Sequence, residues 1–473
     1  MTTPLPFRLR WTAGTGVFLI GVASAAFTAF VLYHRQSAVQ SSIDVNGFGL
    51  ISRNLALGKG FSLGFGPTIR RAPLYPVLGA LLLKAFGHAT PGVPDAVAYR
   101  PIVIAQCLMF GLTCLVTWAL ARRLFGQSVA LIAGLLCALL PQTVRYVGQT
   151  EVETLMGFLT VCIAYASIIF VEKPTVRAGA VLGLSIAAAT LTKPIAQFYP
   201  IVFIPLAWWW WRSRSRHSSS PRRQPATYAR SAGTAALIIF FLLPLVPWLV
   251  RNYVITGGHF LGISSNAPGE FLRGYILAEP RYYLLRSSEA SWDSDANDYE
   301  TQLLASHGLP FYHFNSPESG SFVVQPPIPP TVSLVRYEAQ KDTVEETEAL
   351  KRLAHSPGEA LRKFIIQLAT FWYFVDGRAK SLITGALAFA ILACSTVGVL
   401  WARKQQAIIW PALALAVYFY MAYASTLALA RYSMPLYPTL VVFAANGVAV
   451  LATWASRVRT ASRVASPALH SEV

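Results

Sequence analysis

The sequence predicts an all-α protein that crosses a membrane many times. Of its 473 residues, 54% are hydrophobic and only 13% are charged, and the mean hydropathy is +0.48. Soluble chains of this length rarely have such a composition, whereas polytopic membrane proteins do. In addition, ten separate apolar runs approach the roughly 17–25 residues that a helix needs to cross the hydrocarbon core.

The apolar runs set the expected order of helices and loops. The predicted spans are 14–33, 98–121, 127–142, 154–171, 176–193, 195–211, 232–250, 381–401, 407–428 and 434–455. No small-residue cleavage site follows the first run, so we expect a retained helix rather than a signal peptide. The run 74–86 is too short to cross the bilayer, and we expect it and 359–376 to be helices in the outer interface.

The distribution of charge predicts the orientation. The net charge of +18 does not indicate nucleic-acid binding, because the basic residues form short clusters between apolar runs. With a cytoplasmic N-terminus, the cytoplasmic segments collect these clusters and contain only two of the 21 acids, Glu172 and Glu472. Short loops rich in Arg and poor in acid belong in the cytoplasm. Both termini are therefore expected there.

This topology divides the chain into three expected parts. Residues 1–250 form an N-terminal transmembrane module that includes the first outer loop, 34–97. Residues 251–380 form an outer loop domain with an interfacial helix, and 381–473 hold the C-terminal membrane helices and a basic cytoplasmic tail. In the outer domain, SWDSDANDYE at 291–300 lacks the Gly and the final Glu of a calcium loop, and we interpret it as a solvated acidic loop.

Three acids at the outer face are candidate site residues, because ionisable groups at a membrane face are usually functional. Asp44 could act as a general base or could cap the helix that follows it. Glu151 and Glu153 lie in the short outer loop between the third and fourth spans. They could bind a metal, hold an acceptor or position a basic residue, or they could lie in a solvated loop or helix start.

Four basic residues are candidates for binding a phosphate: Arg71, Lys193, Arg251 and Arg431. Arg can hold phosphate oxygens through two parallel hydrogen bonds, and Lys can act as a point charge. The alternative is that these side chains reach for lipid headgroups at the interface. No cofactor is certain from the sequence: the five cysteines lie in apolar runs without zinc spacing, and a divalent metal remains open.

Six segments of the chain, in this order, carry a resemblance to a known family of proteins. They are Asp44 in the first outer loop, RAPLYPVLGALLLKAFG at 71–87, ALARRLFG at 119–126, LTKP at 191–194, PWLVRNYVITGG at 247–258 and ARYSMPLYP at 430–438. Together they resemble the GT-C superfamily of membrane glycosyltransferases, and in particular the branch that holds protein O-mannosyltransferases and the lipid A aminoarabinose transferase. Two positions differ from that pattern. Val45 follows Asp44 where many relatives have a second acid, and Ala72 replaces the first Pro of the PPLYP element.

The resemblance implies a transferase of the bacterial inner (plasma) membrane. It would move a sugar from a polyprenyl phosphate to a hydroxyl of a lipid, glycan or protein at the outer face, with inversion. Asp44 would be the base, and Arg71, Lys193, Arg251 and Arg431 would bind the donor phosphate. An O-antigen-type polysaccharide ligase or polymerase and a non-enzymatic lipid or sugar transporter are the alternatives. No nucleic-acid partner is expected.

Overall fold

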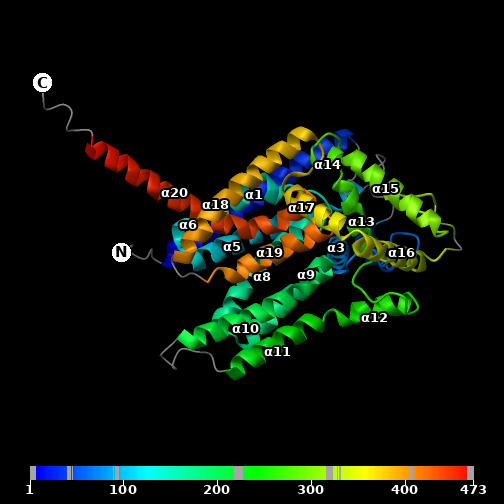
Figure 1. The fold of residues 1–473 in the computed structure, drawn as a ribbon, viewed down its shortest axis with the longest axis horizontal. Coiled ribbons are helices and arrows are strands. Elements are labelled where there is room, and N and C mark those ends of the chain that lie inside the picture. The colour runs from blue at the N-terminus through cyan, green and yellow to red at the C-terminus, as the bar shows by residue number, and fades with distance from the viewer. Residues whose placement is uncertain are drawn as a thin grey trace.

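The computed structural model is an elongated bundle of helices with a group of shorter helices at one end (Figure 1). It describes residues 7–39, 44, 46–88, 90, 95–217, 227–315, 323–327, 329, 332–404 and 408–465. Within these ranges the only strands are a short antiparallel pair, β1 (His313–Asn315) and β2 (Val323–Gln325). The predicted all-α membrane fold is confirmed.

Six of the ten predicted spans are helices long and apolar enough to cross a membrane, by length and composition. They lie in α1 (Phe7–Val39), α5 (Arg100–Phe125), α8 (Glu153–Glu172), the pair α11 (Thr227–Leu242) and α12 (Val246–Ile255), α18 (Arg378–Lys404), and η3 (Ala430–Leu436) with α20 (Tyr437–Ala465). The other four are the shorter helices α6 (Gln127–Leu139), α9 (Val176–Thr192), α10 (Tyr199–His217) and α19 (Trp410–Ser425).

Small residues bring the long helices into close contact. In the α18–α20 pair, a Cβ added at Gly398 would lie 2.0 Å from the carbonyl oxygen of Phe443, and one at Gly447 would lie 2.0 Å from that of Cys394. In the α9–α11 pair, a Cβ at Gly179 would lie 2.0 Å from the carbonyl oxygen of Gly233. Membrane helices gain stability from such close backbone packing, since lipid supplies little hydrophobic drive between them.

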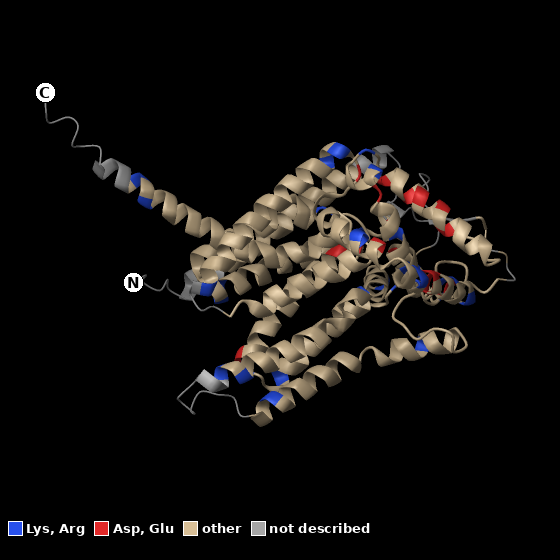
Figure 2. Cartoon of the chain, viewed as in Figure 1, with Lys and Arg blue, Asp and Glu red and all other residues tan. Residues whose placement is uncertain are grey.

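The acids are concentrated at one end of the bundle, whereas Lys and Arg occur at both ends (Figure 2). The start of α1 and the end of α20 lie at one end, where Lys and Arg predominate, and most acids lie at the opposite end. This distribution agrees with the predicted alternation of loops. The orientation of the chain in a membrane stays a prediction.

The end rich in acids is built from the first outer loop and the outer helices. The first outer loop contains α2 (Phe48–Ala56) and α3 (Leu74–Ala85), and the α4 turn (Asp95–Ala98) leads into α5. The outer helices are α13 (Ala267–Leu277), α14 (Pro280–Tyr283), α15 (Glu289–Ser306), α16 (Leu334–His355) and α17 (Pro357–Tyr373). The expected interfacial helices, 74–86 and 359–376, correspond to α3 and α17. The three-part domain division itself stays a prediction.

The interpretation of 291–300 as a solvated loop was wrong, because this stretch is part of helix α15. The side chain of Ser288 caps the helix by accepting a hydrogen bond from the Ser291 amide at 3.1 Å. Trp292, Ala296 and Glu300 recur at intervals of four residues and are buried. This apolar and charged stripe packs one face of the helix against the outer domain.

Candidate active site

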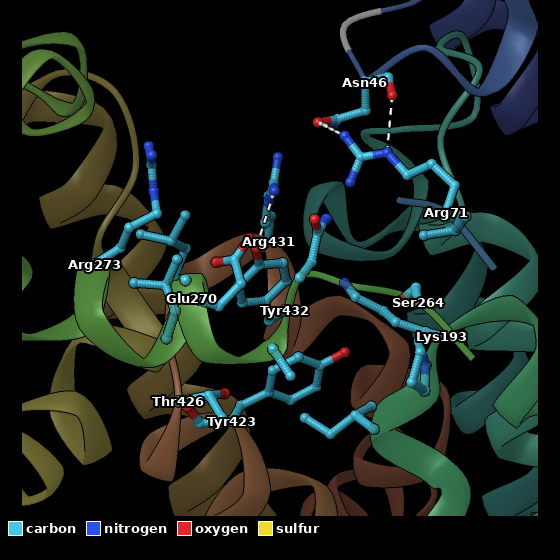
Figure 3. A pocket seen from close by; sticks show the side chains of 18 of the residues that line it. Asn46, Arg71, Lys193, Ser264, Glu270, Arg273, Tyr423, Thr426, Arg431 and Tyr432 are labelled. Atoms are coloured by element: carbon cyan, nitrogen blue, oxygen red, sulfur yellow. Dashed lines mark hydrogen bonds between the residues drawn. The ribbon is translucent and has the colours of Figure 1, made fainter. Parts of the chain in front are cut away.

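A cavity of about 720 Å³ lies between the outer helices and the bundle. Its wall comes from segments far apart in the chain: the first outer loop, the start of α8, the α9–η1 junction, α13, α15, the end of α19 and η3 (Figure 3). Charged side chains are concentrated on this wall. They are Arg70, Arg71, Lys193, Arg273, Lys341 and Arg431 and the acids Glu151, Glu153, Glu270, Glu289, Asp293, Glu300 and Asp376.

Arg71 is fixed at the wall by its own loop. Its Nε donates to the backbone oxygen of Asn46 at 3.0 Å, and its Nη2 donates to the side-chain oxygen of Asn46 at 3.1 Å (Figure 3). The guanidinium also lies over the Phe48 ring, 5.1 Å from its centroid. Burial lowers the pKa of Arg71 to about 10, so the side chain remains charged at neutral pH.

The loop that carries Arg71 is tied to the outer domain by Glu338 of α16. The Glu338 carboxylate accepts hydrogen bonds from the Thr68 hydroxyl at 2.7 Å and from the Ile69 amide at 2.8 Å. Glu338 and Thr68 are both buried. A buried charge bonded to a backbone amide and a hydroxyl holds the backbone firmly. Glu338 was not predicted from the sequence, since nothing local links it to residues about 270 positions earlier.

Lys193 enters the cavity from the end of α9. The helix stops at Thr192 because Lys193 takes an extended conformation and Pro194 starts the 3₁₀ turn η1 (Pro194–Phe198). Its Nζ lies 4.0 Å from the centroid of the Tyr432 ring. It also lies 3.6 Å from Oε1 of Glu153. An aromatic face and a carboxylate together stabilise the ammonium group away from bulk water.

Arg431 stands near the centre of the wall in Figure 3. Its Nη2 donates to the hydroxyl of Tyr432 at 3.0 Å. The Tyr432 ring stacks on Tyr423, with centroids 4.9 Å apart and an angle of 11° between the planes. Within the described part of the chain, the buried Nε of Arg431 has no hydrogen-bond partner, and Arg431 forms no ion pair. The positive charge of this guanidinium, which no carboxylate of the described residues contacts in an ion pair, is therefore available to an anion in the cavity.

Asp44 lies behind the cavity wall rather than on it. The residue is fully buried, and its carboxylate accepts from the amides of Gly49 at 2.9 Å and Leu50 at 2.7 Å. It also accepts from the Thr150 hydroxyl at 2.9 Å. Burial raises the pKa of Asp44, although these hydrogen bonds and the nearby charge of Arg71 oppose the rise. Asp44 is not the N-cap residue of α2, which is Gly47, but its carboxylate accepts from two amides in the first turn of that helix.

Glu151 brings a carboxylate to the cavity wall, next in sequence to Thr150, which bonds Asp44. Asn46 donates to Oε1 of Glu151 at 2.5 Å. Burial raises the pKa of Glu151 to about 7, and the neighbouring Glu153 adds to the rise. The charges of Arg431 and Arg71 and the Asn46 hydrogen bond act in the opposite direction. Glu151 can thus exchange a proton near neutral pH.

Arg251, expected with the phosphate-binding residues, does not line the cavity. Its guanidinium donates to the Thr68 carbonyl oxygen and to the Asn252 side chain, both at 2.8 Å. It also lies 4.6 Å from the centroid of the Trp248 ring. Asn252 in turn donates to the Gly262 carbonyl oxygen at 2.8 Å. We therefore place Arg251 among the residues that support the outer loops rather than in the site.

The outer helices contribute side chains that the sequence did not indicate. Glu270 and Arg273 of α13 line the cavity opposite Arg71 and Lys193 in Figure 3. Their spacing of three residues on one helix was a local signal, but only the fold of the outer domain turns that face toward the cavity. Among the described residues, no group of three or more His, Cys, Asp or Glu side chains could hold a metal ion. A divalent metal therefore stays a prediction.

The fold is that of a polytopic membrane protein with a charged cavity at one end, and comparisons with known proteins show what it resembles. The family model for dolichyl-phosphate-mannose-protein mannosyltransferases matches residues 76–248. Among solved structures, the chain is similar to AglB, an oligosaccharyltransferase from Archaeoglobus fulgidus, with a TM-score of 0.54 at 14% identity. That structure is a complex with an inhibitory peptide and a dolichol-phosphate. That match covers 97% of this chain and 52% of AglB.

Another structure of the Archaeoglobus fulgidus enzyme, in the apo form, gives a TM-score of 0.54 at 15% identity over 95% of this chain and 52% of that one. ArnT from Cupriavidus metallidurans, bound to undecaprenyl phosphate, matches with a TM-score of 0.35 at 15% identity. That match covers 92% of this chain and 78% of ArnT. The chain spans about half the length of the oligosaccharyltransferase. A search of curated proteins finds no match. The resemblance to GT-C membrane glycosyltransferases is confirmed, in fold and, over 76–248, in sequence.

Proposed function

We propose that this protein transfers a sugar from a polyprenyl-phosphate donor to a hydroxyl acceptor at the outer face of a bacterial inner membrane. The observation that carries the proposal is the cavity wall itself. Arg71, Lys193 and Arg431 come from three distant segments and line one cavity with the carboxylate of Glu151. Cations fixed around a cavity are what a departing phosphate requires, and a carboxylate there can take a proton.

The three cations are suited to the donor phosphate. Arg431 forms no ion pair among the described residues, and Arg71 is held in place by the backbone oxygen and the side-chain oxygen of Asn46. Preorganised donors stabilise developing negative charge without having to rearrange during the reaction. The likeness in fold to AglB, which has been solved with a dolichol-phosphate, supports a lipid-linked phosphate as the ligand.

We propose Glu151 as the group that accepts the proton. It lines the cavity, whereas the carboxylate of Asp44 faces the amides that start α2. Geometry takes precedence over pKa in choosing a base. Asp44 then acts as a positioning residue, through Thr150, for the adjoining Glu151. Asp44 remains the second candidate for the base, because the resemblance in sequence implies it and bonds in a free enzyme can rearrange when substrate binds.

The reaction then needs one displacement. The acceptor oxygen attacks the anomeric carbon on the face opposite the phosphate, and the bond from that carbon to the phosphate oxygen breaks. The electron pair of the broken bond stays on the phosphate, which Arg71, Lys193 and Arg431 stabilise, and the hydroxyl proton passes to Glu151. The products are an inverted glycoside and a polyprenyl phosphate. A phosphate monoester dianion is a weak base, so the leaving group does not require a general acid.

The charges favour an enzyme over a transporter. A transporter is expected to place ionisable groups near the middle of the membrane, often in interrupted helices. Here the candidate groups line one cavity together with residues of the outer helices, and most acids lie at one end of the bundle (Figure 2). A polysaccharide ligase or polymerase shares the lipid-linked donor and differs in its products. Product analysis therefore separates it from the transferase.

The experiment that tests the proposal measures binding of undecaprenyl phosphate to the full-length protein in lipid nanodiscs. We expect the Arg431→Gln and Arg71→Gln proteins to bind roughly tenfold or more weakly, the usual effect of losing a charged hydrogen bond. Arg281→Gln is the control, since Arg281 is half exposed, pairs with Glu279 and lies off the cavity wall. Equal binding by the wild-type protein and all three variants would overturn the proposed phosphate site.

A further inference from the structure

The side of the cavity formed by the outer helices differs from the side that carries Arg71 and Lys193. We name this side the outer wall, and it consists of Glu270 and Arg273 of α13, Asp293, Asn297 and Glu300 of α15, and Lys341 of α16. Figure 3 shows Arg273 and Glu270 facing Arg71 and Lys193 across the cavity, with Arg431 between them. A transferase needs a second binding surface for its acceptor, and the outer wall faces the proposed donor-phosphate residues across the same cavity.

The cations of the outer wall are already neutralised. Arg273 donates to Asn297 at 2.9 Å and to Glu300 at 3.2 Å, and it also forms an ion pair with Asp293. Lys341 lies 3.6 Å from Glu300 and forms a second ion pair with Glu345. These neighbouring acids raise the pKa of Arg273 above its ordinary value. The outer wall therefore offers little free positive charge to an anionic acceptor.

Acids, in contrast, are in excess on this side. One carboxylate oxygen of Glu270 is buried and has no hydrogen-bond partner in the described ranges. The charge of Glu270 acts on Arg71, Lys193 and Arg273 alike, which places Glu270 at the border between the two sides of the cavity. Glu289 and Asp376 add two more acids to the same lining. A phosphate carried by the acceptor would meet repulsion here.

We propose that the outer wall is the acceptor subsite and that it takes an uncharged acceptor with several hydroxyls, a carbohydrate chain. Each hydroxyl can donate a hydrogen bond without carrying a charge, so a polyol can donate to the carboxylates that line this surface. The reacting hydroxyl extends toward the donor and gives its proton to Glu151. The inference rests on the proposed function and adds the class of acceptor.

The test supplies the full-length protein in nanodiscs with a panel of radiolabelled undecaprenyl-phosphate sugars. The acceptors come from the envelope of cells that express the protein, separated into neutral glycans, phosphate-bearing lipids and proteins. We expect label in the neutral glycans. Label in the phosphate-bearing lipids or the proteins, or donor turnover that leaves the glycans unlabelled, would overturn the acceptor proposal and leave the donor proposal intact. Failure to bind undecaprenyl phosphate at all would overturn the proposed function instead.

Variants of the outer wall locate the effect. Glu270→Gln should raise the KM for the neutral acceptor roughly tenfold without weakening the binding of undecaprenyl phosphate. Asp293→Asn, at a half-exposed position where substitutions usually change stability little, should act in the same direction. Glu348→Gln is the matched control, because Glu348 lies on α16, pairs with Arg352 and is not part of the cavity lining. An unchanged acceptor KM in both wall variants would contradict the proposal.

Discussion

At the scale of single residues, the proposed chemistry depends on Glu151, a carboxylate whose proton affinity is set by its surroundings. Burial of Glu151 and the negative charge of Glu153 favour the neutral form of Glu151. The charges of Arg431 and Arg71 and the hydrogen bond from Asn46 favour its ionised form. The result is a pKa of about 7, well above the ordinary value for a glutamic acid. A base of this kind is half ionised at neutral pH, where its proton affinity and availability are balanced.

A dependence on pH follows from this position. Because only the ionised form of Glu151 can accept a proton, kcat/KM should rise as the pH increases to about 7 and then level off. The check is the pH profile of polyprenyl phosphate release for the wild-type protein and for Glu151→Gln. The variant should lose most of its activity and should no longer show the rise near pH 7. A profile unchanged in shape would exclude Glu151 as the base.

Some residues of the cavity could be predicted from the sequence and others could not, for physical reasons. Arg71, Lys193 and Arg431 each stand near a proline or a helix end in a segment that the sequence predicts at the outer face, and the structure places all three on one cavity wall. Arg251 stands in an equally suggestive position, yet its guanidinium is taken up by Thr68 and Asn252. The local sequence predicts that a basic side chain lies near a membrane face. Only the tertiary contacts decide whether that side chain lines the cavity or bonds neighbouring loops.

At the scale of elements, close helix pairs give the cavity a rigid base. The α18–α20 pair is joined where Gly398 and Gly447 face the partner backbone. The end of α20 nearer the cavity continues from η3, which carries Arg431. Packing between these two helices therefore fixes the direction in which η3 leaves the bundle.

Replacing Gly398 by Leu tests this contact. Since even a Cβ would lie 2.0 Å from the Phe443 carbonyl oxygen, the helices must separate, and we expect a loss of about 1–3 kcal/mol or more in stability. Thermal unfolding in detergent, followed by size-exclusion chromatography, measures the loss. Gly16→Leu in α1 is the control, because nothing lies within 4 Å of a Cβ at Gly16. Equal melting temperatures for the two variants would contradict this account of the packing.

Elements were predicted best where they are long and apolar. The spans in α1, α5 and α8 follow from uninterrupted hydrophobic runs, which lipid strongly favours as helices. The acidic stretch 291–300 was misread because its composition is polar, and its buried positions at intervals of four residues are few. Those positions gain their meaning only from the outer domain that covers them.

At the scale of the whole molecule, the membrane bundle and the outer helices form the cavity together. Glu338 of α16 holds the loop of Arg71, and Lys363 of α17 donates to the carbonyl oxygens of Phe271 at 3.0 Å and Ser425 at 2.9 Å. These bonds connect α16, α17 and α13 to the first outer loop and to the end of α19. The composition predicted a membrane bundle, but it carried no information on how the outer domain closes over it.

The central claim is that this shared cavity transfers a sugar from a polyprenyl phosphate with Glu151 as the proton acceptor. The most direct measurement is the release of polyprenyl phosphate from a labelled donor by the wild-type, Glu151→Gln and Asp44→Asn proteins, with donor binding measured in parallel. We expect Glu151→Gln to bind the donor normally and to lose at least about a hundredfold in release, the usual contribution of a general base. Normal release by Glu151→Gln, together with loss in Asp44→Asn alone, would contradict the assignment and return the role to Asp44.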